Sequence, residues 1–91
     1  MDSRIKFLAD RYGLRHQCVK AREELVELVE ALKVFEEKWT PETFIHVAEE
    51  MADVEIMTKQ LKYLMANACI VSRFKDSKLN RQLDRIARGE E

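Results

Sequence analysis

The sequence is poor in the residues that make tight turns, with two glycines and one proline among its 91 residues. A sheet with many turns needs more of both, so this scarcity favours a few long helices joined by short loops. The length leaves room for one domain, which excludes a multidomain enzyme or a long solenoid. We therefore expect residues 1–91 to form a single all-α domain.

The sequence also lacks a strong net charge and a long apolar run. Its formal net charge is -1, so nothing draws the whole chain to a nucleic acid polymer or an anionic membrane. The longest stretch without a charged residue, residues 63–72, is about half the length of a bilayer span. Cys18 and Cys69 have no metal-binding spacing, and residues 1–10 lack the apolar stretch of a signal peptide. We expect a cytoplasmic protein with reduced thiols.

Breaker residues and apolar periodicity divide the chain into four predicted helices. They cover, approximately, residues 3–12, 14–38, 41–66 and 72–87. Gly13 ends the first of them. Thr40 and Pro41 open the third, with a hydroxyl N-cap followed by proline at the first helical position. The two central helices are therefore long and the outer two are shorter.

Two pairs of acidic residues lie on helix faces that should be apolar. At about 100° per residue, Glu24 and Glu27 border the apolar stripe of the second predicted helix. Glu50 and Asp53 fall inside the apolar stripe of the third. The apolar members of that stripe are Val47, Val54, Met57, Leu61 and Leu64. Each pair has the i, i+3 spacing that puts two side chains on one face, so we expect the four carboxylates to converge.

Four converging carboxylates need positive charge between them, because burying an unpaired carboxylate costs several kcal/mol. A cage made only of oxygen ligands selects Mg²⁺, with Mn²⁺ as a substitute, and leaves positions open for water and phosphate. The alternative interpretation is that these acids form salt bridges with basic residues on neighbouring helices. Two pairs on apolar stripes favour the metal.

Other polar residues lie where a phosphate bound to such a metal needs partners. Gln17 and Lys20 precede Glu24 on the same helix face, as a candidate amide contact and a candidate counter-charge. The last predicted helix carries a cationic stripe made of Lys78, Arg81 and Arg85. Such a stripe complements the remaining oxygens of a polyphosphate. Taken alone, both sets are also typical of an ordinary solvated surface.

His16 is a candidate contact for a base or a sugar, together with Phe35 or Trp39. The alternative is that Phe35 belongs to the core and Trp39 covers a helix end. On the opposite side of the second predicted helix from Glu24 lie three apolar residues, Val19, Val26 and Val29. They are candidates for contact with another helix in the same or a neighbouring subunit, because a chain this short has a thin core.

The acidic motifs resemble those of a known family. E-E-L-V-E at residues 23–27 and E-M-A-D at residues 50–53 resemble the E-E-x-x-E … E-x-x-D signature of MazG-like nucleoside triphosphate pyrophosphohydrolases. These enzymes belong to the all-α NTP pyrophosphatase superfamily, and the likeness spans most of the chain. It implies a four-helix bundle that binds Mg²⁺. It also implies cleavage of a nucleoside triphosphate between its α- and β-phosphates, which releases a nucleoside monophosphate and pyrophosphate.

The resemblance also implies roles for individual residues. The metal ligands carried over from the signature are Glu24, Glu27, Glu50 and Asp53. Glu23 and Glu49 are flanking acids that hold or activate water. Gln82 stands where many relatives have an asparagine, which departs from the family pattern in the basic helix. Relatives are dimers or tetramers in which a neighbour helps to close the nucleotide pocket, so the resemblance implies a homo-oligomer.

Two other functions fit an all-α chain with inward acids. A carboxylate-bridged di-iron bundle needs Glu-x-x-His twice, and neither His16 nor His46 stands three residues after a glutamate. A non-catalytic interaction or regulatory module needs only amphipathic helices. The leading prediction is the Mg²⁺-dependent pyrophosphohydrolase, and the interaction module is the alternative.

Overall fold

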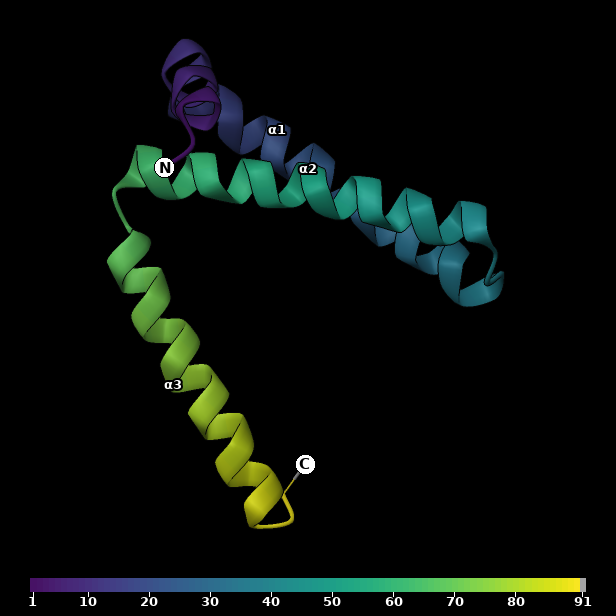
Figure 1. Cartoon of the computed structure of the whole chain (residues 1–91). Coiled ribbons are helices and arrows are strands. Elements are labelled where there is room, and N and C mark those ends of the chain that lie inside the picture. The colour runs from purple at the N-terminus through teal and green to yellow at the C-terminus, as the bar shows by residue number, and fades with distance from the viewer. Residues whose placement is uncertain (91) are drawn as a thin grey trace.

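The structure is a computed structural model that describes residues 1–90, so residue 91 of the predicted domain lies outside the description. It consists of three helices, α1 (Ser3–Glu37), α2 (Pro41–Met65) and α3 (Ala68–Ala87), and the described residues include no strand. The predicted all-α class is confirmed. α1 and α2 run antiparallel as a hairpin, and α3 leaves the end of α2 as a separate arm (Figure 1).

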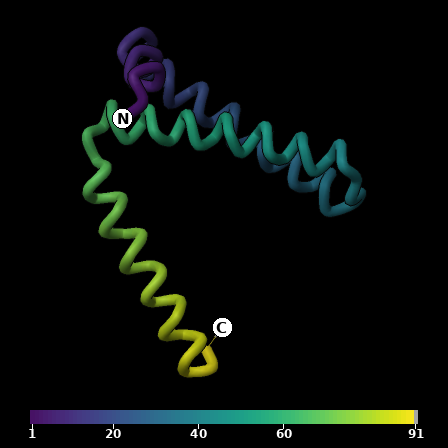
Figure 2. The backbone as a smooth tube through the Cα atoms, in the orientation of Figure 1, coloured from purple at the N-terminus to yellow at the C-terminus, as the bar shows by residue number. Residues whose placement is uncertain are grey.

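The predicted count of four helices is not confirmed, because the structure joins the first two predicted helices, across the predicted break at Gly13, into one element, α1. Gly13 interrupts α1 with a φ of 82° and a ψ of 168°, a conformation that glycine adopts readily and other residues do not. The helix resumes directly after this residue, so Ser3–Glu37 is a single kinked helix. Figure 2 shows the segment before the kink turned away from the axis of the rest of α1. The last helix also begins at Ala68, four residues before its predicted start.

The start of α2 follows from its local sequence, as predicted. The Thr40 hydroxyl accepts a hydrogen bond from the Thr43 backbone N–H at 3.1 Å. The Thr43 hydroxyl accepts one from the Thr40 backbone N–H at 3.0 Å, which completes a capping box ahead of Pro41. Thr43 also donates to the Lys38 carbonyl at 2.7 Å, so the same residue ties the hairpin turn to the first turn of α2.

The contact between α1 and α2 is narrow and contains small residues. The buried apolar residues of the described chain are Ala9, Ala21, Ala31 and Met57. The buried polar residues are Gln17, Glu24 and Gln60. Alanines allow two helix backbones to approach closely, but they contribute little buried apolar area. Polar side chains therefore make up a large share of the buried residues between the two helices, and the stability of the hairpin depends on their having hydrogen-bond partners.

A polar contact holds the segment before Gly13 against the end of α2. The Tyr63 hydroxyl donates to Asp10 Oδ1 at 2.8 Å, and Lys6 Nζ lies 3.1 Å from Asp10 Oδ2. The hydrogen bond from Tyr63 and the neighbouring Lys6 lower the pKa of Asp10 below its ordinary value. Ala9, on the same segment, is fully buried. These contacts fix the direction that the chain takes before the kink.

The α3 arm packs against neither of the other helices, and none of its residues is buried. Its large apolar side chains are 51–64% exposed, and they are Ile70, Phe74, Leu79, Leu83 and Ile86. The radius of gyration of the described chain is 16.3 Å, well above the roughly 12 Å of a compact domain of this length. One chain by itself therefore does not form the predicted four-helix bundle. Among the described residues, no helix combines the length and the apolar character that crossing a membrane requires.

Candidate metal and ligand site

Three of the four predicted metal ligands come together where α1 and α2 pack. Glu24 and Glu27 of α1 and Glu50 of α2 each place a carboxylate oxygen so that all three oxygens lie within 4.8 Å of one another. Glu24 is buried, the Glu50 side chain is 12% exposed, and Glu27 is exposed. The i, i+3 spacing puts both α1 acids on one face, and the antiparallel hairpin brings Glu50 to that face.

Two oxygens of this cluster lack a hydrogen-bond partner. Glu24 Oε2 and Glu50 Oε2 are both buried, and no donor in the described residues reaches either of them. An unpaired buried carboxylate oxygen costs free energy, and native proteins nearly always give such an atom a partner. An all-oxygen set of three carboxylates with two vacant acceptors suits a hard divalent cation. These three side chains could therefore hold a metal ion.

Basic residues near the cluster neutralise only part of its charge. Lys20 Nζ lies 3.2 Å from Glu24 Oε1 and 3.8 Å from Glu23 Oε2. The pKa of Lys20 is raised, first by its hydrogen bond to Glu24 and then by the surrounding carboxylates. His46 Nε2 lies 3.9 Å from Glu50 Oε1 and adds charge only when protonated. Glu24 thus forms a salt bridge within its own helix, not with a neighbouring helix as the alternative interpretation expected, and one lysine does not balance three carboxylates.

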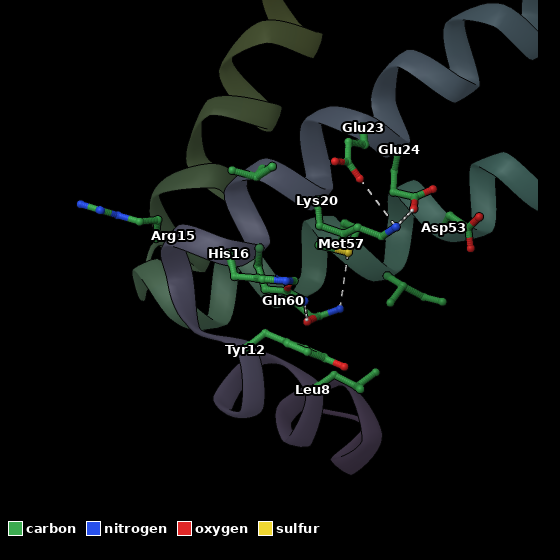
Figure 3. A pocket seen from close by; sticks show the side chains of 13 residues that line it. Leu8, Tyr12, Arg15, His16, Lys20, Glu23, Glu24, Asp53, Met57 and Gln60 are labelled. Atoms are coloured by element: carbon green, nitrogen blue, oxygen red, sulfur yellow. Dashed lines mark hydrogen bonds and ion pairs between the residues drawn. The ribbon is translucent and has the colours of Figure 1, made fainter.

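Asp53, the fourth predicted ligand, lies outside this cluster. The sequence places it inside the apolar stripe of α2, yet its side chain is exposed. It lines an open groove next to Glu24 (Figure 3). Because the hairpin is antiparallel and Gln17 contacts Gln60, residue 53 stands across from residue 24. Its short side chain faces the groove at that level, and the expectation of a buried position was wrong.

The groove has a volume of about 950 Å³ and runs between α1, α2 and the segment before Gly13. Its acidic end is formed by Lys20, Glu23, Glu24 and Asp53 (Figure 3). This end adjoins the carboxylate cluster, because Glu24 belongs to both.

The other end of the groove is aromatic and amide-rich. Gln17 Nε2 donates to Gln60 Oε1 at 2.7 Å, and these side chains are 4% and 2% exposed. His16 Nδ1 lies 2.7 Å from Gln17 Oε1, and the His16 ring stacks on Tyr12 with centroids 4.8 Å apart. The predicted candidates His16, Gln17 and Lys20 all line this groove.

Sequence reasoning missed Tyr12, Met57 and Gln60 as groove residues. Gln60 had a usable signal, because it follows Met57 by three positions and so interrupts the apolar stripe of α2 with an amide. Tyr12 had none, since its position depends on the backbone bend at Gly13.

Several predicted site residues lie elsewhere. Phe35 and Trp39 stack with centroids 5.1 Å apart near the hairpin turn and do not line the groove. Phe35 is half-buried there and Trp39 is exposed. Glu49 is exposed on α2 outside the groove.

The predicted cationic stripe does not reach the acids within one chain. Lys78, Arg81 and Arg85 lie exposed on α3, which points away from the hairpin (Figure 1). Val19, Val26 and Val29 are 48–60% exposed, and Val19 also lines the groove. Within one chain, the cationic stripe, Val26 and Val29 do not line the groove.

Comparisons of this chain with protein-family models, with curated proteins and with solved structures found no match in any of the three. The likeness to MazG-like pyrophosphohydrolases therefore depends on the acidic motifs and their order along the sequence.

Proposed function

We propose that this protein is a Mg²⁺-dependent nucleoside triphosphate pyrophosphohydrolase. It would cleave the bond between the α- and β-phosphates and release a nucleoside monophosphate and pyrophosphate. The observation that carries the proposal is the meeting of Glu24, Glu27 and Glu50 with two buried oxygens left unpaired. The likeness of residues 23–27 and 50–53 to the MazG-like signature supports the choice of reaction.

The three clustered glutamates would hold the metal, and Asp53 on the groove wall is the proposed fourth ligand. When bound, Mg²⁺ or Mn²⁺ neutralises phosphate oxygens and acidifies a water molecule. Lys20 offers a further positive charge to phosphate at the acidic end of the groove. Glu23 is the proposed acceptor of the proton that the attacking water loses. Phosphoryl transfer asks a protein mainly for positioning and charge neutralisation, which these groups provide.

We further propose that the protein works as a homodimer or homotetramer. α3 carries five basic and two acidic residues, whereas α2 carries two basic and five acidic residues. The arm of one chain thus complements the hairpin of another in charge, and its exposed apolar side chains need cover. In such an assembly Lys78, Arg81 and Arg85 would approach the groove of a neighbour. We propose a cytoplasmic location on the sequence grounds given above.

The exposed apolar face of α3 also supports a second candidate function. A non-catalytic module could use this arm to bind another protein, with the acids serving only as surface charge. The two candidates differ in their response to ligands. A ligand that binds only the native state raises the melting temperature, so Mg²⁺ with a non-hydrolysable nucleotide should stabilise the enzyme and leave the module unchanged.

The activity is tested by incubating the protein with each ribo- and deoxyribonucleoside triphosphate in Mg²⁺ and measuring pyrophosphate. Glu50→Gln keeps the shape of the side chain but removes a ligand charge, so we expect release to fall by at least about 100-fold. Glu30→Gln is the matched control, because Glu30 is exposed on α1 and paired with Lys33. Pyrophosphate release from none of the nucleotides, or release unchanged by Glu50→Gln, would refute the proposal.

Metal binding can be tested separately from activity, by measuring the melting temperature. Without divalent ions, Glu50→Gln should melt at a higher temperature than the wild type, because it removes one of three mutually repelling carboxylates. On adding Mg²⁺ the order should reverse, since only the wild type holds the ion with its full set of ligands. Equal responses of the two proteins to Mg²⁺ would show that the cluster does not bind the metal.

A further inference from the structure

We propose that the amide end of the groove, formed by Tyr12, His16, Gln17 and Gln60, binds the base of the nucleotide and prefers a base that has a carbonyl oxygen where cytosine and adenine have their amino group. This inference rests on the proposed function in one respect, because it takes the ligand to be a nucleotide. It names a recognition site and a chemical preference that the acidic motifs do not contain.

The amide end of the groove lies at a suitable distance from Glu24 to hold one part of a nucleotide while its phosphates lie near Glu24. Gln17 and Glu24 are seven residues apart on one face of α1, which is two helical turns or about 10 Å along the axis. Both side chains line the same groove. A ribose and a phosphate can bridge such a span. A nucleotide with its phosphates at Glu24 therefore brings its base to Gln17.

The walls of the amide end suit a flat ring. The Tyr12 and His16 rings stack with an interplanar angle of 18°, and so present aromatic surface beside the groove. Leu8 and Ile56 line the same groove and are partly exposed to solvent. Nucleobases stack on aromatic side chains and pack on apolar ones whatever their sequence identity. A base that stacks here removes this aromatic and apolar surface from water, which stabilises the complex.

The buried glutamines supply the chemical preference. Gln60 Oε1 accepts from Gln17, and Gln17 Oε1 is in contact with His16 Nδ1, so both amide oxygens are engaged. Each amide NH₂ carries two hydrogens. Gln17 Nε2 uses one of them on Gln60, and Gln60 Nε2 has only the Met57 sulfur at 3.7 Å, a weak acceptor.

Each amide oxygen thus already has one partner and keeps one lone pair, whereas Gln60 Nε2 has no strong acceptor, so the least satisfied groups of this pair are its N–H donors. The natural partner of these donors is a carbonyl oxygen on the ligand. Uracil, thymine, hypoxanthine and guanine carry such an oxygen in place of the amino group of cytosine or adenine. The groove should accordingly select keto bases of either ring size.

The test uses nucleosides, the full chain and no divalent metal, so that phosphate and metal binding play no part. Uridine, inosine, cytidine and adenosine are titrated while NMR follows the side-chain amide signals of Gln17 and Gln60. Inosine and adenosine have the same ring size and differ at one substituent, as do uridine and cytidine at the corresponding position. We expect inosine and uridine to bind at least about tenfold more tightly than their amino counterparts.

Substitutions locate the effect. Gln60→Met keeps the length of the side chain but removes the amide, so it should abolish the keto preference. Glu55→Met, at an exposed position of α2 outside the groove, is the control and should keep the preference. Tyr12→Ala should weaken all four nucleosides about tenfold through lost stacking, whereas Tyr12→Phe should bind like the wild type. The ratio of inosine to adenosine binding in the wild type needs no substitution and decides the matter even if a variant unfolds.

Equal binding of keto and amino nucleosides would overturn the inference, and so would the absence of shifts at Gln17 and Gln60. Shifts of these amides on raising the protein concentration alone would also overturn it, since a second copy would then fill the groove. The proposed reaction is judged separately by pyrophosphate release. Hydrolysis without nucleoside shifts removes only the base site, while keto-selective shifts without hydrolysis remove only the reaction.

Discussion

The hairpin of α1 and α2 and the arm α3 both carry apolar and charged residues along their helices, but their environments are opposite. Every buried residue of the described chain lies in the hairpin, and none lies in the arm. In the hairpin, polar residues that face the partner helix are paired, as Gln17 is with Gln60, or clustered, as the three glutamates are. In the arm, apolar and basic side chains alike face solvent.

This difference shows that amphipathicity tells which face of a helix needs a partner, but not whether the same chain supplies it. The hairpin is joined by a three-residue turn, so its two helices meet at little entropic cost. The arm begins after Ala66, whose left-handed φ of 51° turns the chain away from the α2 axis. Its apolar face is thus left uncovered by the rest of the chain. The following predictions, from the largest effect to the smallest, compare the hairpin with the arm.

The largest effect is expected from the apolar stripe of the arm. Leu79→Ser with Leu83→Ser should leave the helical content nearly unchanged, because neither side chain is buried within one chain. It should weaken self-association by about 3–6 kcal/mol if both side chains are covered in the assembly. Light scattering after size-exclusion chromatography measures the mass. Asn80→Ser with Asp84→Ser, on a different face of α3, is the control, and an unchanged mass in the leucine variant would contradict the prediction.

The next effect contrasts two alanines. Ala31 is buried in the hairpin seam and Ala87 is exposed near the end of the arm. Ala31→Leu should lower the free energy of unfolding by about 1–3 kcal/mol, because the seam has no room for three more carbons. Ala87→Leu should change it by less than about 0.5 kcal/mol. Urea denaturation followed by circular dichroism compares the two, and equal effects would mean that the arm is packed as tightly as the hairpin.

Gly13→Ala should have a somewhat smaller effect, of about 1–2 kcal/mol. The φ of 82° at Gly13 strains any residue with a Cβ, although no neighbouring atom obstructs a Cβ there. Gly89→Ala has a similar φ of 74° but stands beyond the last helix, where the chain can relax, so it should cost less. Urea denaturation measures both. Loss of the Tyr63 to Asp10 contact in NMR spectra of Gly13→Ala would show that α1 has straightened.

The smallest effect concerns the contact that anchors the segment before the kink. Tyr63→Phe removes the hydrogen bond to Asp10, and we expect the melting temperature to fall by about 2 °C at neutral pH. Because folding lowers the pKa of Asp10, its stabilisation is present above the ordinary carboxyl pKa of about 4 and is lost as the pH falls through the folded value. The difference between variant and wild type should therefore vanish in acid. A difference that stays constant down to pH 2 would contradict this.

The sequence predicted the local features well, because each depends on neighbours along the chain. The N-cap at Thr40 and the break at Gly13 are both where the sequence predicted them. The i, i+3 spacing of Glu24 and Glu27 predicted that they share a face. The sequence could not predict that Asp53 faces an open groove, because this depends on how far apart two helices lie at that level.

By itself, then, the sequence determined that the chain is helical, where α2 begins, and which acids share a helix face, since propensity, capping and the 3.6-residue period are local. Only the tertiary structure decided that Glu50 meets Glu24 and Glu27 and that Gln17 pairs with Gln60, because the antiparallel register of α1 and α2 sets both. It also decided that α3 leaves the hairpin. An amphipathic helix needs a partner for its apolar face. The backbone conformation at Ala66, between α2 and α3, determines which surface that face can meet.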